Sequence, residues 1–117
     1  MSPYSSVAVA NYFVNSALTE GVSITPMKVL KLTYIAHGFH LAVSGESLIN
    51  DKVEAWKFGP VIPTLYHEVK VFGLGEIGSM ISLWDGAKGQ FRYPVVDKND
   101  TSSSEKLSLV WGHYKNY

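Results

Sequence analysis

The apolar residues near the start of the chain repeat at three- and four-residue intervals, which is typical of an amphipathic helix. This spacing predicts a helix over residues 5–18. Ser5 or Ser6 can cap its start, and Gly21 can end it by adopting a positive φ at low cost. The apolar residues at these intervals are Val7, Ala10, Val14 and Leu18.

The second predicted helix has the clearest boundaries in the sequence. Thr25 serves as its N-cap, Pro26 takes the first helical position, where a missing N–H costs nothing, and Gly45 marks the end after Val43. One apolar stripe of this helix consists of Met27, Leu30, Tyr34, His37 and Leu41. Most of the remaining surface carries further apolar residues, namely Leu32, Ile35, Ala36 and Phe39. So wide an apolar arc predicts a central helix that is buried on more than one side.

The periodicity then changes. Residues 53–58 have the β-branched and aromatic content of a short strand, and Leu48-Ile49, across Asn50-Asp51, could pair with it in a small hairpin. We expect Gly59-Pro60 to break this run. Pro63 is placed to start a third helix, which Gly73 closes. Its apolar residues are Leu65, Tyr66, Val69 and Phe72.

The last third of the chain is rich in turns. Residues 73–89 hold five of the ten glycines, and we expect a loop that packs on the core with room for one helical turn. Residues 91–96 are predicted to be extended. Ser102 and Glu105 have the spacing of a capping box for a last helix over about 103–116. The fold class expected is mainly α (α+β): four or more helices around a central buried helix, with a short β-hairpin.

The composition of the chain indicates which kind of partner to expect. The chain of 117 residues is sized for one domain, 1–117, and its 10 basic and 10 acidic residues give a net charge of zero. No nucleic-acid binding is expected, because a phosphate-backbone binder normally carries excess positive charge. With 13% aromatic residues, the composition instead favours a protein partner, and a neutral surface also does little to oppose a homodimer.

The sequence predicts a cytoplasmic protein. It has no Cys, which suits a reducing compartment and excludes disulfides and thiolate metal sites. The start of the chain lacks the pattern of a secretory signal, and no apolar run is long enough to span a membrane, so no membrane association is expected.

Candidate chemistry is sparse. His37 and His40 lie three residues apart on one predicted helix, but neither they nor His67 and His113 have the companions that a metal site needs. There is no Gly-x-Ser-x-Gly elbow, and the glycines at 73, 75 and 78 fit no phosphate-binding loop. We therefore expect no catalytic residues, no metal, no cofactor and no enzymatic activity, although a small hydrolase or metal enzyme built around His37, His40 or His67 stays open as an alternative.

A contact surface is the better candidate. Trp56 and Phe58 flank a turn, with Tyr66 close behind, and buried aromatic anchors dominate protein interfaces. The alternative for Trp56 and Phe58 is that they close one end of the helical core. Three more candidates for partner binding lie in segments that the core least requires. These are Trp84, Phe91 and Tyr93.

Two segments resemble a known family. Residues 24–38 are similar to a Thr-Pro-Leu-Lys-x-x-Lys-Leu-x-Tyr-x-Ala-x-Gly pattern, and residues 53–63 to a Glu-Ala-Trp-x-x-Gly-Pro-Val-x-Pro pattern, with Tyr66 where the family carries an aromatic residue. Both patterns occur in the Panacea, or SocA-like, domain of bacterial and prophage antitoxins. The resemblance implies that the matching residues are mostly scaffold: Pro26, Lys28, Lys31, Tyr34, Glu54, Trp56, Gly59, Pro60 and Pro63.

The resemblance also implies a function. Such a protein would neutralise a toxin by direct stoichiometric binding, either by sequestering it or as an adaptor that delivers it to a protease. Family members usually continue beyond the last helix into a further tail, whereas this chain ends at Tyr117, which implies a domain shortened at the C-terminus. The alternative function is a phage or mobile-element inhibitor of a bacterial defence complex, similar to an anti-CRISPR protein, built on the same fold.

Overall fold

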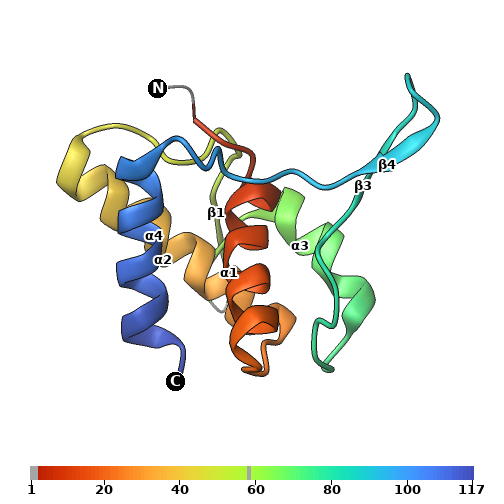
Figure 1. Cartoon of the computed structure of the whole chain (residues 1–117), viewed down its shortest axis with the longest axis horizontal. Coiled ribbons are helices and arrows are strands. Elements are labelled where there is room, and N and C mark those ends of the chain that lie inside the picture. The colour runs from red at the N-terminus through yellow and green to blue at the C-terminus, as the bar shows by residue number, and fades with distance from the viewer. Residues whose placement is uncertain (1–2, 58) are drawn as a thin grey trace.

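The first helix, α1 (Ser6–Glu20), is the most buried element of the protein. In the computed structural model, which describes residues 3–57 and 59–117, its N-cap Ser5 accepts a hydrogen bond from the backbone N–H of Ala8, and Gly21 ends it in the left-handed conformation at φ 69°. Nine of its 15 residues are buried, because the three α-helices that follow it in the described chain all contact it (Figure 1). The capping residues predicted from the sequence are confirmed.

Helix α2 (Pro26–Ser44) also begins and ends where its sequence predicts. Thr25 caps the backbone N–H of Lys28, and Gly45 closes the helix at φ 74°. The helix contacts α1, α3 and α4, so it is central to the packing. Its buried residues nevertheless lie along one side, namely Pro26, Val29, Leu32, Thr33, Ala36 and His40.

The predicted core stripe of α2 is therefore wrong. Met27, Tyr34 and Leu41 are exposed, while Leu30 and His37 are only half-buried. The helix is apolar around most of its circumference, so its own sequence could not indicate which side the other helices would cover. The expectation that α2 is buried on more than one side also fails, because its buried residues all lie along one side of the helix.

The strand in the middle of the chain pairs with a different partner from the one predicted. β1 (Glu54–Trp56) pairs antiparallel with β2 (Gly59–Val61), so Gly59 and Pro60 extend the hairpin instead of breaking it. Leu48 and Ile49 are buried in the core, where Ile49 forms a parallel bridge with Tyr4. These two residues are buried in the hydrophobic core and do not pair with β1, because burying their apolar side chains is more favourable than a local hairpin.

The third helix follows the predicted course. α3 (Pro63–Val69) begins at Pro63 and continues into a single 3-10 turn, η1 (Lys70–Phe72), before Gly73. Leu65 and Val69 on α3 are fully buried in the hydrophobic core, and α3 contacts both α1 and α2.

The glycine-rich segment becomes a projecting hairpin. Ile77 and Ile81 are buried, which confirms that it packs on the core, but no helical turn forms between residues 74 and 92. β3 (Leu83–Asp85) instead pairs antiparallel with β4 (Gln90–Arg92), and this pair extends away from the helices (Figure 1). We call residues 83–93 the arm.

The last helix, α4 (Thr101–Tyr114), begins slightly earlier than predicted. Its N-cap is Asp100, whose carboxylate accepts a hydrogen bond from the backbone N–H of Ser103 at 3.2 Å, so the predicted capping box of Ser102 and Glu105 is wrong. Asp100 is buried and also accepts a hydrogen bond from the Tyr4 hydroxyl at 2.8 Å. The Asp100 carboxylate is a better N-cap than the Ser102 hydroxyl, because it is charged and accepts hydrogen bonds from both Ser103 and Tyr4.

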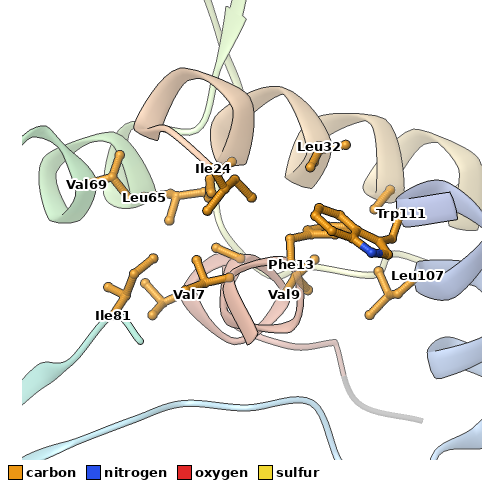
Figure 2. Packing of buried hydrophobic residues seen from close by; sticks show 14 of the residues in the cluster. Val7, Val9, Phe13, Ile24, Leu32, Leu65, Val69, Ile81, Leu107 and Trp111 are labelled. Carbon is orange, nitrogen blue, oxygen red and sulfur yellow. The ribbon is translucent and has the colours of Figure 1, made fainter. Parts of the chain in front are cut away.

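The hydrophobic core lies between α1 and the three helices around it. Phe13 on α1 packs on Trp111 of α4, with ring centroids 6.4 Å apart, and Val7 faces the side of α3 (Figure 2). The indole N–H of Trp111 donates to Glu20, which also pairs with Lys115, so the two helices are tied at their C-terminal ends. Over the described residues the fold has four α-helices and two small antiparallel strand pairs, which confirms the mainly α class.

Candidate partner-binding surface

An apolar groove opens on the exposed side of α2. It is lined by Met27, Lys31 and Tyr34 of α2, Trp56 and Pro60 of the β1–β2 hairpin, and Tyr66 of α3. The lining is completed by Leu30, Ile35, Lys57 and Val61, and we call these ten residues the aromatic groove. Its volume is about 500 Å³, which is within the range of ligand pockets and large enough to accept several side chains of a partner.

The wall of the aromatic groove is formed by a pair of rings. Trp56 and Tyr66 meet edge to face with centroids 5.3 Å apart, and the indole N–H of Trp56 donates to the carboxylate of Glu54 at 2.9 Å. Both contacts hold the indole in place although 40% of Trp56 is exposed. A ring that is fixed and accessible loses little entropy when a partner covers it, which is what an interface anchor requires.

The first aromatic cluster predicted from the sequence is therefore brought together only in part. Trp56 and Tyr66 adjoin at the surface, so Trp56 does not close the end of the core. Phe58 lies outside the described residues. That Trp56 and Tyr66 contact a partner stays a prediction.

A second groove continues along the same side of α2 toward its C-terminal end. Tyr34, His37 and Leu41 form one wall, Leu109 and His113 of α4 form the other, and the volume is about 860 Å³. The Nδ1 atom of His37 is buried and has no hydrogen-bond partner among the described residues. Burial, with a smaller contribution from His40, lowers the pKa of His37, which favours a neutral imidazole there.

The arm carries the other predicted contact residues. Trp84 and Phe91 are directly opposite each other in the β3–β4 register, with ring centroids 5.1 Å apart, and each is 61% exposed. Tyr93 follows β4 and is also largely exposed. A turn stabilised by Asp85, which accepts hydrogen bonds from the backbone N–H groups of Ala87 and Lys88, joins the two strands.

The residues expected to be scaffold divide into two groups. Pro26, Lys28 and Pro63 support the fold: both prolines start helices, and the ammonium of Lys28 donates to the carbonyl oxygen of Lys115. Burial lowers the pKa of Lys28. Gly59 supports the hairpin, since its φ of 120° suits only glycine.

The second group lies at the surface. Lys31, Tyr34, Trp56 and Pro60 line the aromatic groove, and Glu54 holds the Trp56 indole. Sequence reasoning did not assign Met27 and Tyr34 to a surface, because their spacing is that of a core stripe. The available signal was Lys31, a charged residue between them on the same helix.

The histidines do not assemble into a metal site. No group of three or more potential metal ligands occurs among the described residues. His40 is a buried residue whose Nδ1 lies 2.9 Å from the carbonyl oxygen of Glu46 and 3.1 Å from the hydroxyl of Ser44, while His67 and His113 are exposed. In the part of the chain that the structure describes, no helix has the length and apolar character needed to cross a membrane.

Comparisons with known proteins give one family. The family profile described as "Antitoxin SocA-like, Panacea domain" matches residues 29–117, which includes α2 from Val29 onward and the arm. Antitoxin SocA of Caulobacter vibrioides (strain NA1000 / CB15N) is 44% identical over 59 residues, and the aligned segment covers 50% of this chain and 31% of that relative. No solved structure matches the chain significantly.

Proposed function

The chain belongs to the Panacea (SocA-like) antitoxin domain family, and on this premise we propose that it neutralises a partner toxin by direct stoichiometric binding. The relative that it matches is named an antitoxin, but the aligned segment is 31% of that protein. Direct binding of a toxin by this chain is thus our proposal, and it rests on the surface of the molecule.

The aromatic groove is the observation that carries the proposal. A fixed, accessible Trp56–Tyr66 pair beside the exposed Met27 has the composition of an interface hot spot, in which aromatic residues and Met are enriched. The arm offers a second aromatic patch, Trp84 and Phe91, on a projecting hairpin. Both patches are available to a protein partner without any rearrangement of the core.

We further propose that the chain acts without catalysis, in the cytoplasm, on a protein and not on nucleic acid. The net charge of zero supports a protein target, and no Ser, His, Asp or Glu is among the residues that line the aromatic groove. Four helices contributing to one hydrophobic core support the proposal of a single domain. A homodimer through the exposed aromatic residues is a further proposal, tested by the mass of the purified protein in solution.

The test is a co-expression experiment with the protein encoded beside this chain in its native genome. If the proposal is correct, the neighbouring protein arrests growth when expressed alone, the chain restores growth, and the two purify as a complex of defined stoichiometry. Trp56→Ala and Tyr66→Ala should weaken rescue. Val71→Ala, an apolar truncation on the exposed 3-10 turn, is the matched control and should rescue normally.

The result also decides between the antitoxin and the inhibitor of a bacterial defence complex. A neighbour that is harmless when expressed alone contradicts the antitoxin proposal. Restored phage infection in cells that carry an active defence system, lost in Trp56→Ala, would then assign the same groove to a counter-defence role.

A further inference from the structure

The aromatic groove carries positive charge in a protein whose net charge is zero. Lys31 and Lys57 line it, and no Asp or Glu is among its lining residues. The side chain of Lys31 is exposed, and its ammonium makes no hydrogen bond or ion pair with any residue that the structure describes. The carboxylate of Glu54, which belongs to the same hairpin, accepts the hydrogen bond of the Trp56 indole. The groove therefore presents a cationic group that a ligand could neutralise.

The rest of the groove is apolar. Met27 is 64% exposed and has a flexible thioether that adapts to different side chains, while Trp56, Tyr66 and Pro60 provide rigid walls. This combination requires two features of one ligand: an aliphatic or aromatic side chain that fills the space, and an adjacent carboxylate that reaches Lys31. A short peptide segment supplies both.

We propose that the aromatic groove binds a segment of the partner protein in which acidic residues flank aromatic or aliphatic anchors, and that Lys31 selects the acidic residues. The identification of the ligand as a protein segment rests on the proposed function, whereas the choice of an acidic segment rests on the charge of the groove. The second groove, along Tyr34 and His37, lacks this argument because no Lys, Arg, Asp or Glu lines it.

The test uses a random peptide library displayed on phage and selected against the intact wild-type protein. The peptides that enrich should combine Asp or Glu with aromatic or aliphatic residues. Their affinities are then measured by fluorescence anisotropy against Lys31→Glu and against Lys98→Glu, which makes the same charge change at an exposed residue of the loop before α4. We expect about a tenfold loss with Lys31→Glu, a much smaller one with Lys98→Glu, and binding that weakens as salt is added.

Several outcomes would overturn the proposal: enrichment of basic or uncharged peptides, equal affinity for wild type and Lys31→Glu, or no enrichment at all. Loss of peptide binding in Trp56→Ala, with circular dichroism confirming that the variant is folded, would place the peptides in the aromatic groove. The peptide experiment involves no toxin. A failure of growth rescue with intact peptide selectivity thus contradicts only the antitoxin role, and the reverse result contradicts only the selectivity.

Discussion

The side chain of Asn11 pairs with the backbone of Ile81 through two reciprocal hydrogen bonds. The Asn11 amide group donates to the Ile81 carbonyl oxygen at 2.9 Å, and the Ile81 N–H donates to the Asn11 side-chain oxygen at 2.7 Å. The same amide group also donates to the carbonyl oxygen of Pro94 at 2.8 Å. One buried side chain of α1 therefore holds the chain where it enters and where it leaves the arm.

The first prediction concerns this anchor. Asn11→Ala would leave the backbone groups of Ile81 and Pro94 without their partner, and buried polar groups that lose their hydrogen bonds are costly. We expect the free energy of unfolding to fall by about 2–4 kcal/mol, measured by urea denaturation. Amide exchange at Ile81 should also accelerate.

The matched control for the anchor is Asn15→Ala, because Asn15 is an exposed asparagine on the same helix. Its effect should stay within about 0.5 kcal/mol. An unchanged midpoint for Asn11→Ala would show that the anchor contributes nothing to stability.

The second prediction separates surface from core tryptophans. Trp84→Ala removes a largely exposed ring whose described aromatic partner is Phe91, so the free energy of unfolding should change by less than about 1 kcal/mol. Trp111→Ala, which empties a buried site beside Phe13, should cost about 3–5 kcal/mol. Thermal unfolding followed by circular dichroism measures both. If the arm contacts the partner, Trp84→Ala should weaken complex formation while the fold persists, and a large stability loss would instead make Trp84 a core residue.

The third prediction concerns alkaline pH. Burial, together with the hydrogen bond to Asp100 and the negative charge of that residue, raises the pKa of Tyr4 to about 12. In the unfolded chain a tyrosine titrates near 10, so the unfolded state loses this proton first. The stabilisation from Tyr4 is therefore complete below pH about 10 and is lost as the pH rises toward 12. Wild type should lose stability over this interval more steeply than Tyr4→Phe, as urea unfolding at each pH would measure; parallel curves would contradict the assignment.

The fourth prediction concerns acidic pH at the same pair. Burial alone would raise the pKa of Asp100, but hydrogen bonds from Tyr4 and Ser103 outweigh it and hold this pKa below its usual value. Because the unfolded state binds the proton more readily, the stabilisation is complete above the unfolded pKa and is lost as the pH falls through the folded one. Asp100→Asn should remove this part of the acid sensitivity, whereas Asp97→Asn, a neighbouring exposed carboxylate, is the control. An acid-unfolding profile of Asp100→Asn that matches wild type would refute the linkage.

The fifth prediction concerns His37. Its pKa is lowered in the folded state, so the unfolded chain takes up the proton first as the pH falls through about 6.5. Folding stability should therefore decrease from neutral pH toward pH 5, and His37→Leu should flatten that decrease. His67→Gln, which replaces an exposed imidazole on α3, is the control. A wild-type slope in His37→Leu would mean that another group is responsible.

The sequence predicted the helices better than the faces they present. The sequence predicts a helix boundary correctly where the capping residue lies next to the helix and acts alone, as at Ser5 and Gly21. The start of α4 was displaced because Asp100 cannot be distinguished from Ser102 as a cap without Tyr4, which lies 96 residues away. Several neighbouring residues can cap the start of a helix, and a contact with a residue distant in the sequence decides which of them does.

The candidate site was predicted in part for a related reason. Trp56 and Tyr66 were recognised as an aromatic cluster, because they lie close together in the chain. The sequence pattern predicts core positions for Met27 and Tyr34, because an apolar stripe on a helix usually faces inward. Their exposure follows from the way α1, α3 and α4 pack on α2, which covers other positions of the helix and which no local pattern records.

The sequence by itself determined the mainly α class, the capping of α1 and α2, and the resemblance of two segments to the antitoxin family, since each depends on residues close together in the chain. Only the tertiary structure decided which side of α2 is exposed, which strand pairs with β1, and that Asn11 anchors the arm. These three features depend on which apolar surfaces are buried together and on which buried polar groups then need hydrogen-bond partners. Both are decided by contacts between segments that are distant in the sequence.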